Sequence, residues 1–207
     1  MKVLLINGSP RKEGNTYLAL QEVANRLKNN GIETEMLSIG VKPVRGCIAC
    51  GHCHETNAGH CAFDDDLCNR AIDALGQADG LIVASPVYYG QPNGTLVSLI
   101  QRMLYAGGAQ AQNKPVAVIA VCRRGGATAA LQTMAMPFQL LNMPIVTSQY
   151  WNIAYGRDKG EVEQDAEGLQ TMRTMADNMA WLLKNLHGEN AVPAPEREMR
   201  KGTNFVR

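Results

Sequence analysis

Short, nearly continuous apolar runs recur along this chain, and each is followed by a glycine-rich turn and a helical pattern. Residues 2–7 (KVLLIN) form the first run, which ends at the turn residues Gly8, Ser9 and Pro10. An apolar run that does not alternate with polar residues is typical of a strand buried on both faces. Such strands occur in parallel sheets that helices cover on both sides, so this feature favours an α/β fold.

The same alternation continues toward the C-terminus. Apolar residues at helical spacing follow over residues 15–30 and end at Gly31, a residue that commonly terminates helices. Further strands are predicted at residues 33–38, 81–84, 116–121 and 143–148, and further helices at 67–77, 94–105, 127–141 and 162–187. Right-handed crossovers between these strands produce a three-layer, doubly wound α/β fold. For five parallel strands we predict flavodoxin-type order, 2-1-3-4-5.

The 207 residues are enough for one substantial core, and no change of composition divides them. We therefore predict one domain over residues 1–187 that includes a cysteine-rich insertion at 46–62. Residues 188–207 are predicted to form an extended C-terminal arm. Its prolines and charges are typical of a solvated tail, and an arm that wraps a neighbouring subunit has the same composition.

Charge and cysteine usage exclude several classes of protein. A net charge of +1 with scattered basic residues and 5% aromatic residues argues against a nucleic-acid partner. The first apolar run is too short for a signal peptide or a membrane span, so we expect a cytoplasmic protein. Without a secretory signal, the six cysteines are expected to be reduced thiols, metal ligands or redox groups.

The loop after the first predicted strand has the composition of a phosphate site. Residues 8–16 (GSPRKEGNT) place glycines, hydroxyls, an amide and two cations before a helix N-terminus, where free backbone N–H groups and the helix dipole attract anions. The pattern matches neither a nucleotide P-loop nor a classical dinucleotide fingerprint. Ordinary turn and cap residues are the alternative interpretation. The predicted phosphate contacts are Ser9, Arg11, Lys12, Asn15 and Thr16.

Two further loops follow strands that end at the same predicted edge, where open α/β sheets bind ligands. In residues 85–94 two tyrosines between Pro86 and Gly90 offer an aromatic face to a flat heterocycle such as an isoalloxazine. Packing of these tyrosines on the next helix is the alternative. At residues 122–127 the glycines would let the backbone approach a ligand closely. The predicted ring contacts are Pro86, Val87, Tyr88, Tyr89, Gly90, Gly125 and Gly126.

Together, the motifs in residues 8–16 and 85–90 resemble those of the NADPH-dependent FMN reductase branch of the flavodoxin superfamily. The resemblance covers about residues 1–187. It implies FMN with its phosphate on the first loop, its ring on residues 86–90, and further contacts around Gly125 and Gly126. It also implies a homodimer or homotetramer, because members of this group commonly build the flavin pocket at a subunit interface.

Four cysteines lie within fifteen positions between the second strand and the next helix. Cys47, Cys50 and Cys53 follow Cys-x-x-Cys-x-x-Cys spacing, and Cys61 comes after seven more residues. This spacing lets three thiolates converge on an iron–sulfur cube, with a fourth ligand from a loop. The segment resembles that of the iron-sulfur flavoproteins of the same superfamily, which implies a 4Fe–4S cluster on these four cysteines near FMN.

Other uses of these thiols remain open. Zinc could take some of them together with His52, His54 or His60, and Cys50 with Cys53 could form a dithiol pair. Free thiols are a third interpretation. Cys68 and Cys122 are expected to be packing residues or neighbours of the flavin.

The predicted activity is an FMN-dependent oxidoreductase that passes electrons from NAD(P)H or a reduced carrier to a small acceptor such as a quinone or flavin. The flavin supplies the chemistry, so no catalytic residue is predicted, and no acid–base triad stands out. Partners would be a small molecule or a redox protein. The alternatives are an iron-sulfur flavoprotein carrier that works with ferredoxin, and a redox sensor based on Cys50 and Cys53.

Overall fold

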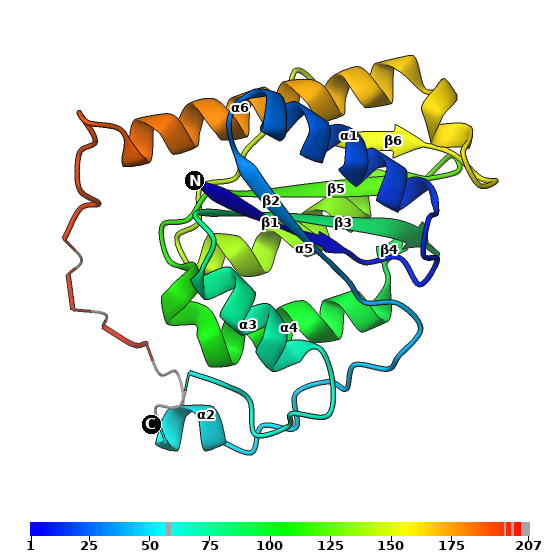
Figure 1. Ribbon diagram of the computed structural model, residues 1–207. Coiled ribbons are helices and arrows are strands. Elements are labelled where there is room, and N and C mark those ends of the chain that lie inside the picture. The colour runs from blue at the N-terminus through cyan, green and yellow to red at the C-terminus, as the bar shows by residue number, and fades with distance from the viewer. Residues whose placement is uncertain (57–58, 197, 200, 204–207) are drawn as a thin grey trace.

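A central sheet separates two layers of helices in the computed structural model, which describes residues 1–56, 59–196, 198–199 and 201–203 (Figure 1). The strands are β1 (Lys2–Asn7), β2 (Glu33–Ser38), β3 (Gly80–Tyr88), β4 (Gln91–Pro92), β5 (Val116–Cys122) and β6 (Ile153–Tyr155). The helices are α1 (Asn15–Asn29), α2 (His52–Glu55), α3 (Cys68–Gly76), α4 (Gly94–Ala111), α5 (Ala127–Leu140), the 3-10 helix η1 (Glu161–Gln164) and α6 (Ala166–His187).

The strands lie in the order β2-β1-β3-β5-β6, and all neighbours along this path are parallel. The short β4 pairs antiparallel with the end of β3 and lies off the path. The doubly wound, flavodoxin-type class is therefore confirmed. Counted without β4, the five parallel strands follow the predicted order 2-1-3-4-5, although the fifth of them is β6 and not the predicted segment.

Two hydrophobic clusters, one on each face of the sheet, make up the core. Alternate residues of β1 enter different clusters: Val3 and Leu5 pack with α1 and α6, whereas Leu4 and Ile6 pack with α3, α4 and α5. The strands β1 and β5 are apolar on both faces because each face meets a helix layer. This burial fixes the register of the strands, and their carboxyl ends meet at one edge.

The predicted fifth strand at residues 143–148 is wrong. This segment forms only an isolated bridge between Ile145 and Val116, after which the chain turns away from the sheet. The Ser148 hydroxyl donates to the Tyr150 carbonyl at 2.6 Å in that turn. The chain returns as β6, which pairs with Ala120–Cys122 of β5. Met143 and Val146 are buried in different clusters. The apolar pattern of this segment therefore comes from core packing, although the segment does not continue as a hydrogen-bonded strand.

Within the predicted arm at 188–207, residues 197, 200 and 204–207 lie outside the described part of the chain. The described residues after Gly188 carry neither helix nor strand. Of the predicted insertion at 46–62, residues 57 and 58 also lie outside the description. No described helix has the length and apolar character needed to cross a bilayer.

Candidate functional site

An open cleft of about 170 Å³ lies at the carboxyl edge of the sheet. The ends of β3 and β5 and the loops after β1, β5 and β6 line it, so four strands that are distant in sequence contribute to one site. The lining residues are Ser9, Arg11, Gly14, Asn15, Thr16, Pro86, Val87, Tyr88, Val121, Cys122, Arg123, Gly156 and Arg157. The cleft is where a doubly wound sheet offers a ligand site.

Seven of the predicted cofactor contacts line this cleft: Ser9, Arg11, Asn15, Thr16, Pro86, Val87 and Tyr88. The lining does not include Lys12, Tyr89, Gly90, Gly125 and Gly126. Tyr89 is fully exposed at a φ of 50°. Gly126 has a φ of +85°, and a Cβ there would lie 2.7 Å from Gly90 Cα, so this glycine permits close packing of two loops.

The first loop is held in shape by one hydrogen bond to β3 and by local hydrogen bonds within the loop. The Gly8 N–H donates to the Ala84 carbonyl of β3 at 2.7 Å, and the Ser9 N–H donates to Asn7 Oδ1 at 3.0 Å. The Arg11 N–H donates to Ser9 Oγ at 3.1 Å. Helix α1 then begins after Gly14, which has no side chain to cap it, and no acidic residue occupies its first turn. This preformed turn before a helix N-terminus suits an anion.

Asn15 has a role that the sequence analysis did not foresee. Its Nδ2 donates to the Asp158 carbonyl at 2.9 Å, and its Oδ1 accepts from the N–H groups of Gly160 (3.0 Å) and Val162 (3.4 Å). The buried amide therefore ties the first loop to residues 156–162. This connection brings Gly156 and Arg157 to the cleft.

Arg123, Gly156 and Arg157 are lining residues that were not predicted. Gly156 and Arg157 directly follow β6. Because the fifth strand was predicted at residues 143–148, the sequence did not indicate that these two residues lie at the carboxyl end of a strand. Arg157 is fixed locally because its N–H donates to the Glu161 carboxylate at 2.6 Å. Hydrogen bonds from the N–H groups of Asp158 and Arg157 lower the pKa of Glu161.

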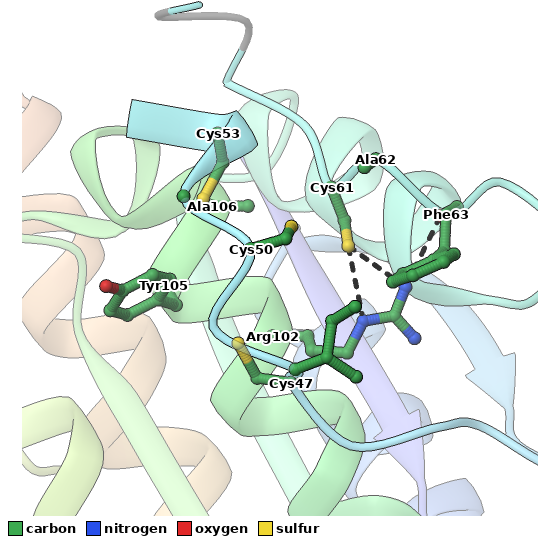
Figure 2. A pocket seen from close by; sticks show the side chains of 11 residues that line it. Cys47, Cys50, Cys53, Cys61, Ala62, Phe63, Arg102, Tyr105 and Ala106 are labelled. Atoms are coloured by element: carbon green, nitrogen blue, oxygen red, sulfur yellow. Dashed lines mark hydrogen bonds between the residues drawn. The ribbon is translucent and has the colours of Figure 1, made fainter. Parts of the chain in front are cut away.

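A second pocket gathers all four cysteines of the predicted cluster motif (Figure 2). Its cavity is small, about 20 Å³, and it shares no lining residue with the first cleft. Cys47 and Cys50 precede α2, and Cys53 lies within it. Cys61 approaches from the segment that follows α2. Ile48, Phe63, Tyr105 and Ala106 add apolar surface. The thiols are thus brought together by tertiary structure as well as by spacing.

The donors in this pocket are the thiols of Cys47, Cys50, Cys53 and Cys61. All four thiols are free, and no group of three or more histidine, cysteine, aspartate or glutamate side chains in the described residues is placed to hold one metal ion. A zinc ion needs its thiolates at about 2.3 Å. A 4Fe–4S cluster binds each thiolate through a different iron, so its ligands converge less closely.

Two of the histidines considered for zinc have other partners. The ring of His54 packs edge-on against Tyr105, with centroids 4.5 Å apart. His60 Nε2 lies 2.7 Å from the Asp73 carboxylate. The outer two cysteines of the close triplet differ in exposure: Cys47 is exposed, and Cys53 is partly buried. Burial raises the pKa of the Cys53 thiol.

Beneath the cysteines lies Arg102 of α4, whose side chain is 1% exposed. It donates from Nε and Nη2 to Cys61 Sγ at 3.4 and 3.2 Å, as Figure 2 shows, and it pairs with Asp66. Burial alone lowers the pKa of Arg102, but its bonds to Asp66 and Cys61 outweigh this and raise it. Burial likewise raises the pKa of Asp66, and the bond from Arg102 then lowers it below its ordinary value.

The two remaining cysteines lie outside this pocket. Cys68 is buried at the start of α3, and burial raises its pKa to about 12. Cys122 is buried at the end of β5 and lines the first cleft. The burial of Cys68 agrees with its expected packing role, and the expectation that Cys122 neighbours the flavin stays a prediction.

Residues 1–158 match the family model described as NADPH-dependent FMN reductase. An iron-sulfur flavoprotein of Methanocaldococcus jannaschii is 35% identical over 192 residues, which cover 89% of this chain and 98% of that relative. An iron-sulfur flavoprotein of Methanosarcina thermophila is 30% identical over 190 residues, which cover 89% and 96%.

Solved structures show the same fold at low sequence identity. RosB in complex with 8-demethyl-8-formylriboflavin-5'-phosphate aligns with a TM-score of 0.71 at 16% identity and covers 100% of this chain and 94% of that one. An archaeal flavodoxin aligns with a TM-score of 0.61 at 16% identity and covers 89% and 99%.

Proposed function

The chain belongs to the NADPH-dependent FMN reductase family and is an FMN-dependent oxidoreductase, and we propose that it also carries a 4Fe–4S cluster. In this proposal Cys47, Cys50, Cys53 and Cys61 hold the cluster, and electrons pass between it and FMN. The observation that carries the proposal is the single pocket that gathers these four thiols from two separate segments.

The first cleft supports FMN through its own residues. In this proposal Ser9, Thr16 and the N-terminus of α1 would receive the phosphate, and Arg11 and Arg157, which line the same cleft, would add positive charge. Pro86, Val87 and Tyr88 line the cleft as well, and they would contact the ring. Bound FMN would supply hydride or single-electron chemistry, and these residues would position it.

Electron donor and acceptor are further parts of the proposal. The family description favours NADPH as the donor, and the names of the relatives favour a carrier of iron–sulfur type. The acceptor would be a small molecule such as a quinone, or a redox protein. A cytoplasmic location and a homodimer or homotetramer also belong to the proposal, on the grounds of the sequence and the family resemblance.

The direct test is anaerobic purification of the full chain, followed by an absorption spectrum and by iron and flavin analysis of one sample. About four irons and one FMN per chain, with a broad shoulder beside the flavin bands, are expected. FMN without iron would leave a simple FMN reductase with free thiols. This second candidate is supported by the family description and by the exposure of Cys47 and Cys50.

The donor is tested on the same preparation. Anaerobic mixing with NADPH, NADH or reduced ferredoxin, followed in the flavin and cluster bands, distinguishes the cases. Rapid reduction by NADPH supports a reductase, and reduction by ferredoxin alone supports a carrier. Reduction by none of the three would contradict both.

A further inference from the structure

Arg102 is a buried cation in a helix that otherwise buries apolar side chains. Its neighbours Leu99, Ile100 and Met103 on α4 belong to the hydrophobic cluster below the sheet. A guanidinium removed from water costs several kcal/mol unless charges and hydrogen-bond acceptors surround it. An apolar side chain would pack equally well at this position of α4. Packing alone therefore does not account for the arginine, and its role depends on the groups that it contacts.

Among the described residues, the hydrogen-bond partners of Arg102 lie between residues 45 and 66, the stretch that carries the four cysteines. Besides Cys61 Sγ and the Asp66 carboxylate, it donates to the carbonyls of Arg45 (3.2 Å) and Phe63 (3.3 Å). Arg45 comes two residues before Cys47, and Phe63 comes two residues after Cys61. One side chain therefore ties the two ends of the segment to α4, and its guanidinium also lies 5.8 Å from the centre of the Phe63 ring.

The four cysteines are not equivalent in this arrangement. Cys61 accepts two N–H groups of a guanidinium. Cys47 accepts one neutral backbone N–H, from Ala49 at 3.4 Å. Hydrogen bonds and nearby positive charge at a ligating sulfur stabilise the more negative, reduced state of an iron–sulfur cluster. The Asp66 carboxylate opposes this effect because it cancels part of the charge of Arg102.

We propose that Arg102 is a positioning residue that holds Cys61 toward the other three thiols and raises the reduction potential of the cluster through its N–H donors to Cys61 Sγ. This inference rests on the proposed function, because it requires a cluster on Cys61. Asp66 lowers the reduction potential of the same cluster, because its negative charge cancels part of the positive charge of Arg102.

The test compares Arg102→Met, Arg102→Lys and Asp66→Asn with the unchanged protein and with Arg70→Met, which alters an exposed arginine of α3. Cluster and FMN potentials are measured on each full-chain protein by anaerobic redox titration followed by EPR and absorption. Iron content and melting temperature are recorded on the same samples.

For Arg102→Met we expect a tenfold loss in the equilibrium constant of cluster reduction, a fall of about 59 mV for one electron. Arg102→Lys keeps the positive charge and should lower the cluster potential by less, whereas Asp66→Asn should raise the cluster potential. The FMN potential and the Arg70→Met protein should stay unchanged. A merely structural role would not give opposite signs for the two partners of one ion pair.

An unchanged cluster potential in an iron-loaded Arg102→Met protein would overturn the inference. If that variant loses its iron or fails to fold, Arg102→Lys decides, because a lowered potential supports the inference and an unchanged one overturns it. Equal shifts of the same sign in Arg102→Lys and Asp66→Asn would also overturn it. Failure of the proposed function is a separate outcome: in that case the protein without any substitution would itself contain no iron.

Discussion

The cleft at the edge of the sheet and the cysteine pocket beside α4 are built in different ways. The cleft is formed by the ends of buried strands, and backbone hydrogen bonds such as that between Gly8 and Ala84 hold its loops. The cysteine pocket lies in a long connection whose residues 45–50 are all exposed and whose single helix, α2, has four residues. Side chains, above all Arg102 and Asp66, hold that connection.

The difference has a physical consequence. A loop anchored on a sheet shares the stability of the core, whereas a segment held by few side chains can open locally at low cost in free energy. We therefore expect changes at the cysteines to leave FMN binding intact, and changes in the cleft to leave iron binding intact. The iron and FMN contents of variants in the two pockets test this independence.

The largest effect is expected from Cys50→Ser. Loss of one thiolate from a four-cysteine site should reduce the iron content from about four per chain to nearly none. The FMN content should stay the same, because the two pockets share no lining residue. Iron and flavin analysis after anaerobic purification measures both. Cys68→Ala, at the start of α3 and outside the pocket, is the matched control and should keep its iron. Loss of FMN from Cys50→Ser would contradict the independence of the two pockets.

A smaller effect is expected from Asn15→Ala in the cleft. The variant loses three hydrogen bonds to residues 156–162, each worth about 1 kcal/mol, so the loop that carries Arg157 should loosen. The dissociation constant of FMN should rise by roughly 10- to 100-fold, since 1.4 kcal/mol is a factor of ten. Fluorescence titration of the apoprotein measures it.

The control for this change is Asn25→Ala, the same substitution at an exposed position of α1. It should bind FMN like the unchanged protein. Iron content should be unaffected in both variants. An unchanged FMN affinity in Asn15→Ala would mean that residues 156–162 do not contribute to the flavin site.

Arg11→Ala tests the phosphate end of the cleft. A hydrogen bond from a charged group is worth about 1.5–3 kcal/mol, and exposure of Arg11 places the expected loss at the lower end, roughly tenfold in FMN affinity. Riboflavin, which lacks the phosphate, should bind both proteins equally. Titrations with the two ligands measure the difference, and an equal loss for both would show that Arg11 acts on the ring.

The smallest effect concerns acid stability of the cysteine segment. The bond from Arg102 keeps the pKa of Asp66 below its ordinary value of 3.8 in the folded protein. Asp66 therefore stabilises the fold above about pH 3.8, and this contribution disappears as the pH falls through the lower, folded-state pKa. Urea unfolding of the unchanged protein and of Asp66→Asn between pH 6 and pH 3 measures this contribution.

The unchanged protein should be the more stable of the two at pH 6, because Asp66→Asn leaves a buried guanidinium without its counter-charge. The gap should narrow toward pH 3. A gap that does not depend on pH would mean that the charge of Asp66 contributes nothing to stability. Asp177 and Glu161, whose pKa values are also lowered, remain present in both proteins.

Helices and buried strands were predicted well where local pattern and core packing agree. The predicted helix at 127–141 is α5, and the predicted strand at 116–121 is β5 within one residue. The predicted helix at 162–187 contains α6, but its first turn belongs to η1 and is separated by Asp165, which caps α6 through the Gly168 N–H. Both β4 and α2 are too short to leave a periodic signal.

The sequence by itself determined the doubly wound class, the turn before α1 and the cysteine spacing, because these depend on residues close together along the chain. Only the tertiary structure decided that Asn15 reaches residues 156–162, that β6 replaces the predicted strand at 143–148, and that Arg102 lies under Cys61. These features join residues tens of positions apart. Their energies come from burial and from partners that no local pattern records.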